Sequence, residues 1–148
     1  MKACIAASGG GHLTEILQVK AALAGIPHYF VSDVRNNSKE LAKSEKVYFL
    51  ECPQRNPLKF LKNFWQSLNI LLKEKPDVIV STGADTAICT CILGKLLGKK
   101  LIFIESYCRV SEASVSGKIG YLIADKFFVQ WKQNLKFFPK ATYAGGVF

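Results

Sequence analysis

Residues with the chemistry of a binding site follow three short apolar runs of this sequence. Residues 8–15 read SGGGHLTE, residues 81–86 read STGADT, and residues 103–110 read FIESYCRV. Glycine lets the backbone approach a ligand closely, and the N-terminus of a helix that follows such a loop favours an anion. Together these stretches indicate a set of loops that face a phosphate-bearing ligand.

The first loop places Gly9, Gly10 and Gly11 directly before His12. Its spacing is not a dinucleotide-binding fingerprint, because a threonine takes the third glycine position, and no Walker-type Gly-Lys-Ser/Thr sequence is present. We expect its backbone N–H groups to face a diphosphate, and His12 to act as a general base or to donate to a phosphate. A tight turn without a ligand and a surface histidine without a role are the alternatives. Glu15, one helical turn later, is expected to have a structural role, capping the helix or orienting His12.

The second and third loops supply further polar candidates. Thr82 and Asp85 have the spacing of a capping box, and Gly83 between them lets the backbone turn tightly. Its position after an apolar run makes this loop a second wall of the crevice that the glycine loop is expected to face. Glu105 lies where a strand is expected to end, and Arg109 can clamp a phosphate with two hydrogen bonds. A buried Glu105–Arg109 ion pair that only fixes the loop is an equally good interpretation.

These loops need a parallel sheet to bring them together, and the hydrophobic pattern predicts one. Short apolar runs alternate with amphipathic segments, as in β-α units. Strands are expected near residues 2–7, 28–32, 46–50, 77–81, 100–105 and 126–130, and helices near 12–24, 57–74, 85–98 and 114–124. The predicted fold class is α/β, with a Rossmann-like parallel sheet flanked by helices in one domain spanning residues 1–148. Open sheets of this kind bind ligands at the carboxyl ends of their strands.

The segment 57–74 is predicted to be an amphipathic helix. Its apolar stripe has helical spacing and consists of Leu61, Phe64, Trp65, Leu68, Leu71 and Leu72. Packing of this stripe against the sheet is the first interpretation. The second is a partly exposed apolar rim, in which Trp65, Lys59 and Lys62 contact an anionic bilayer surface.

Composition limits the classes of function. The 148 residues carry a net charge of +9 and are 49% hydrophobic, which excludes intrinsic disorder as the general description. The lysines are scattered without a recognised nucleic-acid-binding motif, so no nucleic-acid partner is expected. The five cysteines contain no C-x-x-C pair, which argues against a zinc site, and no metal or cofactor is expected. Without a signal-peptide core or a spanning apolar stretch, the chain is expected in the cytoplasm.

Four motifs in this order, SGGGHLTE, PDVIVSTGADT, IESYCRV and ADKFFVQW, resemble the acceptor-side subunits of split GT-B glycosyltransferases. This family includes the membrane-recruiting subunit of the eukaryotic dolichyl-diphosphate N-acetylglucosamine transferase and bacterial counterparts in capsule and exopolysaccharide biosynthesis. The sequence is similar, more distantly, to the amino-terminal domain of the peptidoglycan lipid II-forming transferase. The resemblance implies a fold equivalent to the N-terminal half of a GT-B enzyme.

The resemblance also implies that this chain binds the acceptor, while a separate catalytic partner subunit holds the nucleotide sugar. The acceptor would be a saccharide linked to undecaprenyl or another polyprenyl diphosphate, and the donor UDP-galactose or a similar UDP-sugar. The residues that match the family's acceptor and diphosphate site are Gly9, Gly10, Gly11, His12, Thr82, Gly83, Asp85 and Glu105. We expect His12 first, and Glu105 second, to be the base for the acceptor hydroxyl, with Arg109 beside the diphosphate.

Eukaryotic members of this family carry an amino-terminal transmembrane helix, whereas this sequence starts at its first expected strand. Attachment is therefore expected to be peripheral, at the inner face of the cell membrane, through the amphipathic helix and the basic charge. Two other functions stay open. One is a non-catalytic membrane scaffold that recruits and activates a self-sufficient catalytic subunit, and the other is a nucleotide- or phosphate-binding regulatory module.

Overall fold

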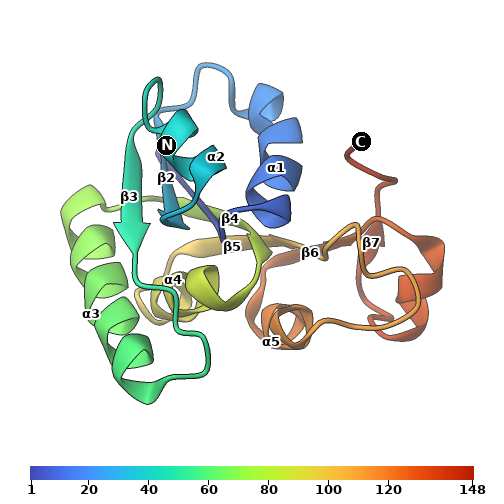
Figure 1. The fold of residues 1–148 in the computed structure, drawn as a ribbon. Helices are drawn as coiled ribbons and strands as arrows, with labels where there is room; N and C mark the ends of the chain where they lie inside the picture. The colour runs from blue at the N-terminus through green and yellow to red at the C-terminus, as the bar shows by residue number, and fades with distance from the viewer.

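One parallel sheet with helices on both faces organises the chain (Figure 1). The computed structural model describes residues 1–148. The strands are β1 (Ala3–Ala7), β2 (His28–Asp33), β3 (Val47–Leu50), β4 (Val78–Gly83), β5 (Lys100–Ile104), β6 (Lys126–Val129) and β7 (Thr142–Tyr143). Their order is β3-β2-β1-β4-β5-β6-β7, and every pair is parallel. β1 is buried along its whole length, which explains its unbroken apolar run ACIAA.

The helices divide between the two faces of the sheet (Figure 1). The first face carries α1 (Gly11–Gln18) and α2 (Asn36–Leu41), and the second carries α3 (Pro57–Glu74), α4 (Asp85–Leu96) and α5 (Val115–Ile123). Two 3-10 segments are η1 (Lys20–Leu23) and η2 (Lys132–Lys136). The predicted fold class is confirmed. None of the helices combines the length and the apolar character needed to cross a membrane.

The connections reverse direction between β1 and β4, which are neighbours at the centre of the sheet. From β1 the chain proceeds to β2, and from β4 it proceeds to β5 on the opposite side. The loops after β1 and β4 therefore lie side by side at the carboxyl edge of the sheet. Open α/β sheets bind ligands at this kind of switch point.

The predicted strands are confirmed, whereas one predicted helix is too long and two short elements were not predicted. The six predicted strands are all present. The helix expected near 12–24 ends at Gln18, because the chain then tightens into η1. α2 and β7 were not predicted, since elements of six and two residues are too short to show a hydrophobic period.

α3 packs with a face that overlaps the predicted stripe only in part. Its buried residues are Asn63, Ser67, Leu71 and Glu74. By contrast, Leu61, Trp65 and Leu72 of the predicted stripe are 53%, 55% and 52% exposed. Leu71 of the same stripe is buried, and Phe64 and Leu68 pack against the core. Both interpretations of the stripe therefore hold, each for a different half of its residues.

Hydrogen bonds explain the orientation of α3. The side-chain amide of Asn63 donates to the backbone oxygens of Glu51 (2.7 Å) and Thr86 (3.1 Å). The Thr90 hydroxyl donates to the hydroxyl of Ser67 (3.0 Å). These bonds between α3, the β3–α3 loop and α4 satisfy buried polar groups, and a rotated helix would leave them unpaired.

The α1 face of the sheet is incompletely covered. Beside η1, a hollow of about 370 Å³ is lined entirely by apolar residues of η1, β4, β5, β6 and their surroundings. Val78, Ile102 and Phe128 pack against the core of this face but are only partly buried. Strand residues typical of a fully covered sheet thus stay accessible on this face.

Candidate functional site

Strained backbone gathers at the carboxyl edge of the sheet. Four residues other than glycine have positive φ, namely Gln54 (47°), Arg55 (60°), Lys75 (48°) and Ala84 (69°). Only Lys75, which ends α3, lies at the opposite edge. Ala84 also has a ψ of 171°, a combination that is almost confined to glycine. Strain of this kind costs about 1–3 kcal/mol per residue and clusters at functional sites.

A cavity of about 290 Å³ opens beside two of these strained residues, Arg55 and Ala84. It lies where the first turns of α4 and α5 meet the first turn of α1. Its polar wall consists of His12, Arg55, Asp85, Arg109, Ser114 and Ser116, and its apolar wall of Ile88, Val115 and Ile119. The cavity can therefore accommodate a ligand that has both an anionic and an apolar part.

Two hydrogen bonds join His12 to Thr82 near the end of β4, and one of them orients the imidazole ring. Its Nδ1 lies 3.0 Å from the backbone oxygen of Thr82, and the Thr82 hydroxyl donates to the backbone oxygen of His12 (3.0 Å). A carbonyl oxygen only accepts, so Nδ1 carries the proton and Nε2 of the neutral ring keeps a lone pair. Burial lowers the pKa of His12, the bond to Thr82 partly offsets this, and Arg109 lowers it further. The ring that lines the cavity is thus neutral near pH 7.

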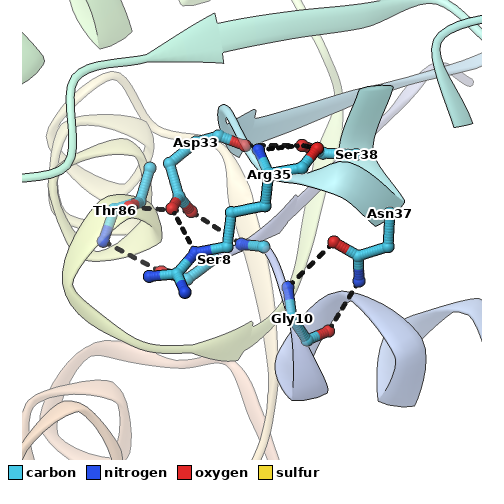
Figure 2. A network of polar contacts seen from close by, with 8 residues as sticks. Ser8, Gly10, Asp33, Arg35, Asn37, Ser38 and Thr86 are labelled. Atoms are coloured by element: carbon cyan, nitrogen blue, oxygen red, sulfur yellow. Dashed lines mark hydrogen bonds and ion pairs between the residues drawn. The ribbon is translucent and has the colours of Figure 1, made fainter. Parts of the chain in front are cut away.

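The glycine loop is partly closed by the chain's own side chains (Figure 2). The N–H of Gly9 donates to Asp33 Oδ1 (2.6 Å), and the N–H of Gly10 donates to Asn37 Oδ1 (3.0 Å). These two N–H groups are not free for a diphosphate, which corrects the prediction for them. The N–H groups of the next two residues have no acceptor within the chain. They are the part of the loop that can bind an anion.

Asp33 joins the glycine loop to α4 (Figure 2). Its Oδ1 also accepts from the Thr86 hydroxyl (3.2 Å), its Oδ2 accepts from Arg35 Nε (2.8 Å), and the N–H of Thr86 donates to Ser8 Oγ (3.1 Å). Burial alone raises the pKa of Asp33, but the bonds from Arg35 and Gly9 outweigh it and lower that pKa. A Cβ on Gly9 would lie 2.8 Å from the Arg35 side chain, so this close approach requires glycine.

The residues of the second loop do not form a capping box. The N-cap of α4 is Ala84, which provides no side-chain cap, and the Thr82 hydroxyl bonds the first loop instead. The capping-box interpretation is therefore wrong. Gly83 has a φ of 86°, and a Cβ there would lie 2.8 Å from side chains of β5 and α5. The carboxylate of Asp85 is exposed on the cavity wall without a hydrogen-bond partner in the chain.

Glu105 is 1% exposed and does not line the cavity. Its Oε1 accepts from the Ser114 hydroxyl (2.7 Å) and the N–H of Ser106 (3.0 Å), while Oε2 packs against Gly117. Ser114 in turn caps α5 by accepting from the N–H of Gly117 (2.8 Å). Burial raises the pKa of Glu105. Glu105 therefore holds the start of α5 in place beneath the cavity.

Arg109 reaches the cavity, but it does not pair with Glu105. Its guanidinium pairs with Glu112, and both side chains are largely exposed. The interpretation of a buried Glu105–Arg109 pair is wrong, because the Glu105 carboxyl bonds to the start of α5 instead. An exposed pair contributes little to stability, so a ligand can displace Glu112 from Arg109.

Glu15 has a structural role different from the two that were expected. Its carboxylate accepts from the N–H of Tyr107 (2.9 Å) and from the side-chain amide of Gln130. The same amide donates to the backbone oxygen of Glu105 (2.9 Å). Burial raises the pKa of Glu15. Glu15 thus ties α1 to the loop that carries Arg109, and it makes no hydrogen bond to His12.

The predicted membrane-facing residues lie on α3 and do not line the cavity. Trp65 is 55% exposed. Lys59 and Lys62 both pair with Glu51, at 3.8 and 2.8 Å. Sequence reasoning missed Arg55, because the turn that carries it has no periodic pattern; the scarcity of arginine is the signal that could have found it.

The sheet order and the carboxyl-edge loops define the chain as the Rossmann-like, N-terminal half of the GT-B glycosyltransferase fold. The crystal structure of Acinetobacter baumannii MurG is similar to it with a TM-score of 0.81 and 18% identity, covering 98% of this chain and 45% of that one. The chain therefore spans less than half the length of that protein.

The family follows from the sequence matches. The family model described as "Oligosaccharide biosynthesis protein Alg14 like" matches residues 51–147. The human UDP-N-acetylglucosamine transferase subunit ALG14 is 30% identical, over 97% of this chain and 81% of its own length. The Polaromonas naphthalenivorans UDP-N-acetylglucosamine--N-acetylmuramyl-(pentapeptide) pyrophosphoryl-undecaprenol N-acetylglucosamine transferase is 36% identical, over 60% of this chain and 23% of its own length. The chain belongs to the Alg14-like family.

Proposed function

We propose that the chain is the acceptor-binding and partner-recruiting subunit of a two-chain glycosyltransferase. The complex transfers a sugar from a UDP-sugar, held by the partner subunit, to a saccharide linked to a polyprenyl diphosphate. The observation that carries this proposal is His12, whose tautomer is set by Thr82 and whose Nε2 makes no hydrogen bond within the chain. Its ring lines the cavity at the carboxyl edge, where open sheets bind ligands.

In this proposal, Nε2 of His12 accepts the proton of an acceptor hydroxyl while the hydroxyl oxygen attacks the anomeric carbon of the sugar. The bond between the anomeric carbon and the UDP oxygen breaks, and its electron pair leaves with UDP. The lowered pKa of His12 keeps the ring in the form that accepts a proton near pH 7. Glu105 is a positioning residue here, because its carboxyl holds α5 beneath the cavity.

The two walls of the cavity suit a prenyl diphosphate that carries a sugar. Arg109 and the free N–H groups at the first turn of α1 supply donors for the phosphate oxygens. Ile88, Val115 and Ile119 supply an apolar wall for the first part of the lipid chain. The free carboxylate of Asp85 can accept a hydrogen bond from a sugar hydroxyl.

The apolar hollow on the α1 face supports the presence of a partner subunit, which we place there. Ala22 of η1 lines this hollow, whereas its neighbour Ala21 does not. Both residues are exposed, so a glutamate at either position should leave the fold intact. Ala22→Glu should abolish co-purification with the partner, and Ala21→Glu should not. Equal effects of the two substitutions would contradict this placement.

An exposed apolar surface on the first half of α3 supports peripheral binding to the inner face of the cytoplasmic membrane. Leu58, Leu61 and Trp65 are 78%, 53% and 55% exposed on neighbouring turns, with lysines nearby. The chain has two tryptophans, so Trp131→Phe leaves Trp65 as the only one. Its fluorescence should shift to shorter wavelength when phosphatidylglycerol vesicles are added. The matched variant Trp65→Phe should show no shift, and a shift there would contradict the assignment.

The names of the relatives make UDP-N-acetylglucosamine the first donor to test. The galactose donor and the capsule or exopolysaccharide pathway expected from the sequence have no support among these relatives. Reconstitution with the product of the adjacent gene, a panel of UDP-sugars and a polyprenyl-diphosphate-linked acceptor tests the proposal. Product should form only when both chains are present.

Full activity of the partner alone would contradict a shared active site. It would favour the alternative function, a membrane scaffold that recruits and activates a self-sufficient catalytic subunit. Such a scaffold would tolerate changes at His12 while still depending on its partner interface.

A further inference from the structure

All three arginines of this chain lie at the carboxyl edge of the sheet. Arg35 follows β2, Arg55 follows β3 and Arg109 follows β5, whereas the rest of the 20 basic residues are lysines spread over the whole chain. Arginine presents a planar fork of N–H donors that can bind a phosphate through two parallel hydrogen bonds, while lysine offers a point charge. The placement of the arginines therefore favours phosphate recognition at this edge.

Arg55 is the one arginine without a partner in the chain. Arg35 pairs with Asp33 at 2.8 Å, and Arg109 pairs with Glu112. No carboxylate lies within ion-pair distance of Arg55, yet its side chain lines the same cavity as Arg109. Two guanidinium groups thus line one cavity, from loops that follow different strands. All the N–H donors of Arg55 are free.

The backbone that presents Arg55 is strained. The N–H of Asn56 donates to the backbone oxygen of Pro53 (2.8 Å), which closes a four-residue turn. The two central residues of this turn, Gln54 and Arg55, have φ values of 47° and 60°. Glycine and asparagine are the residues that favour positive φ in such a turn. An arginine is unfavourable for the backbone at this position. We therefore expect the guanidinium to have a role that offsets this cost.

We infer that Arg55 and Arg109 form a two-sided clamp for the two phosphate groups of a diphosphate bound in the cavity. This inference rests on the proposed function, in which the acceptor carries a diphosphate. Arg109 exchanges the exposed Glu112 carboxylate for a phosphate, and Arg55 has no partner to lose. The apolar wall beside the clamp makes a prenyl diphosphate, rather than a nucleoside diphosphate, the expected source of that group.

Calorimetric titration of the isolated chain with inorganic pyrophosphate tests the clamp. In Arg55→Asn, the new residue adopts positive φ readily, so the guanidinium is removed while the turn is kept. We expect Kd for pyrophosphate to rise by about tenfold, which corresponds to about 1.4 kcal/mol. Arg109→Gln should have a similar effect. Gln54→Asn changes the same turn without removing charge, and should leave Kd unchanged.

Farnesyl diphosphate and UDP distinguish the two sources of the diphosphate. Farnesyl diphosphate should bind more tightly than pyrophosphate and should lose affinity in Arg55→Asn. UDP binding that depends equally on Arg55 would support the clamp but overturn its assignment to the acceptor. The clamp itself is overturned if pyrophosphate does not bind the wild-type chain, if it binds Arg55→Asn normally, or if Gln54→Asn weakens it as much.

Transfer assays separate failure of the clamp from failure of the proposed function. In an active complex, Arg55→Asn should raise KM for the polyprenyl-diphosphate acceptor and leave KM for the UDP-sugar unchanged. An unchanged acceptor KM overturns the clamp and leaves the proposed function in place. If pyrophosphate binding depends on Arg55 but no complex transfers sugar to any such acceptor, the clamp stands and the proposed function fails.

Discussion

Carboxyl groups at the two edges of the sheet have opposite surroundings. At the amino edge, the buried Glu74 carboxylate binds Lys2, Lys46 and Tyr48, and these bonds lower its pKa to about 2. At the carboxyl edge, Glu105 is buried without a cation, and burial raises its pKa. Glu74 at the amino edge is thus neutralised by cations of the chain, whereas Glu105 at the carboxyl edge is not.

Backbone strain and the arginines are also distributed unevenly between the two edges. Three of the four non-glycine residues with positive φ lie at the carboxyl edge, as do all three arginines. At the amino edge, Asp125 binds Lys95 and the N–H of Leu101, and these bonds lower its pKa to about 2. The buried carboxylates of the amino edge thus stabilise the fold, while the carboxyl edge, where we propose that a ligand binds, keeps unsatisfied groups.

The largest expected effect separates the two histidines. Nδ1 of His12 bonds a backbone oxygen at the carboxyl edge, and Nδ1 of His28 bonds the backbone oxygen of Ile26 at the amino edge. His12→Gln should lower kcat of the reconstituted complex by about 10²–10⁴-fold, because the proposed general base is lost. His28→Gln, the matched control, should leave kcat unchanged. Near-normal kcat of His12→Gln at saturating acceptor would remove His12 from the chemistry.

Stability should respond to the amino edge more than to the carboxyl edge. Glu74→Gln removes the partner of two lysines at a buried site and should lower the free energy of unfolding at pH 7 by about 3 kcal/mol. Glu105→Gln keeps an oxygen for Ser114 and should cost about 1 kcal/mol or less. Urea denaturation measures both values. A larger loss for Glu105→Gln would reverse the comparison.

The pH dependence of these two stability differences should run in opposite directions. The pKa of Glu74 is lowered from 4.5 to about 2, so its stabilisation is present above pH 4.5 and is lost as pH falls toward 2. The pKa of Glu105 is raised, so its contribution is present below its ordinary pKa and is lost as pH rises through the raised one. Urea denaturation of both variants and wild type across this pH range checks the signs. If both stability differences changed with pH in the same direction, the opposite pKa shifts of Glu74 and Glu105 would be contradicted.

The smallest expected effect concerns strain. Ala84→Gly at the carboxyl edge and Lys75→Gly at the amino edge both relieve a positive φ, and each should stabilise the chain by about 0.5–1 kcal/mol. Only Ala84→Gly should also raise the acceptor KM, because Ala84 lines the cavity. Thermal unfolding and acceptor titration test the pair. A raised acceptor KM in Lys75→Gly would contradict the assignment of a binding role to the strained residue at the carboxyl edge alone.

Much of the fold could be predicted, because its signals are local. The apolar runs predict all six longer strands, and SGGGHLTE and STGADT predict the loops at the switch point. The bonding of those loops could not be predicted, since Gly9 N–H meets a carboxylate 24 residues away. The polar residues on the buried face of α3 could not be predicted for a similar reason. Its Asn63 bonds Thr86, a contact that exists only after α4 has packed.

The sequence by itself determined the α/β class, the positions of the strands and the loops that carry glycine, histidine and arginine. Hydrophobic period and glycine flexibility act over a few residues, so the order of the chain is enough to reveal them. Only the tertiary structure decided which donors are used within the chain and which stay free. It brought Arg55 to the wall of the cavity that His12 lines, turned Glu105 beneath α5 and left Leu61, Trp65 and Leu72 of α3 exposed. These outcomes depend on contacts between distant segments, which local patterns do not encode.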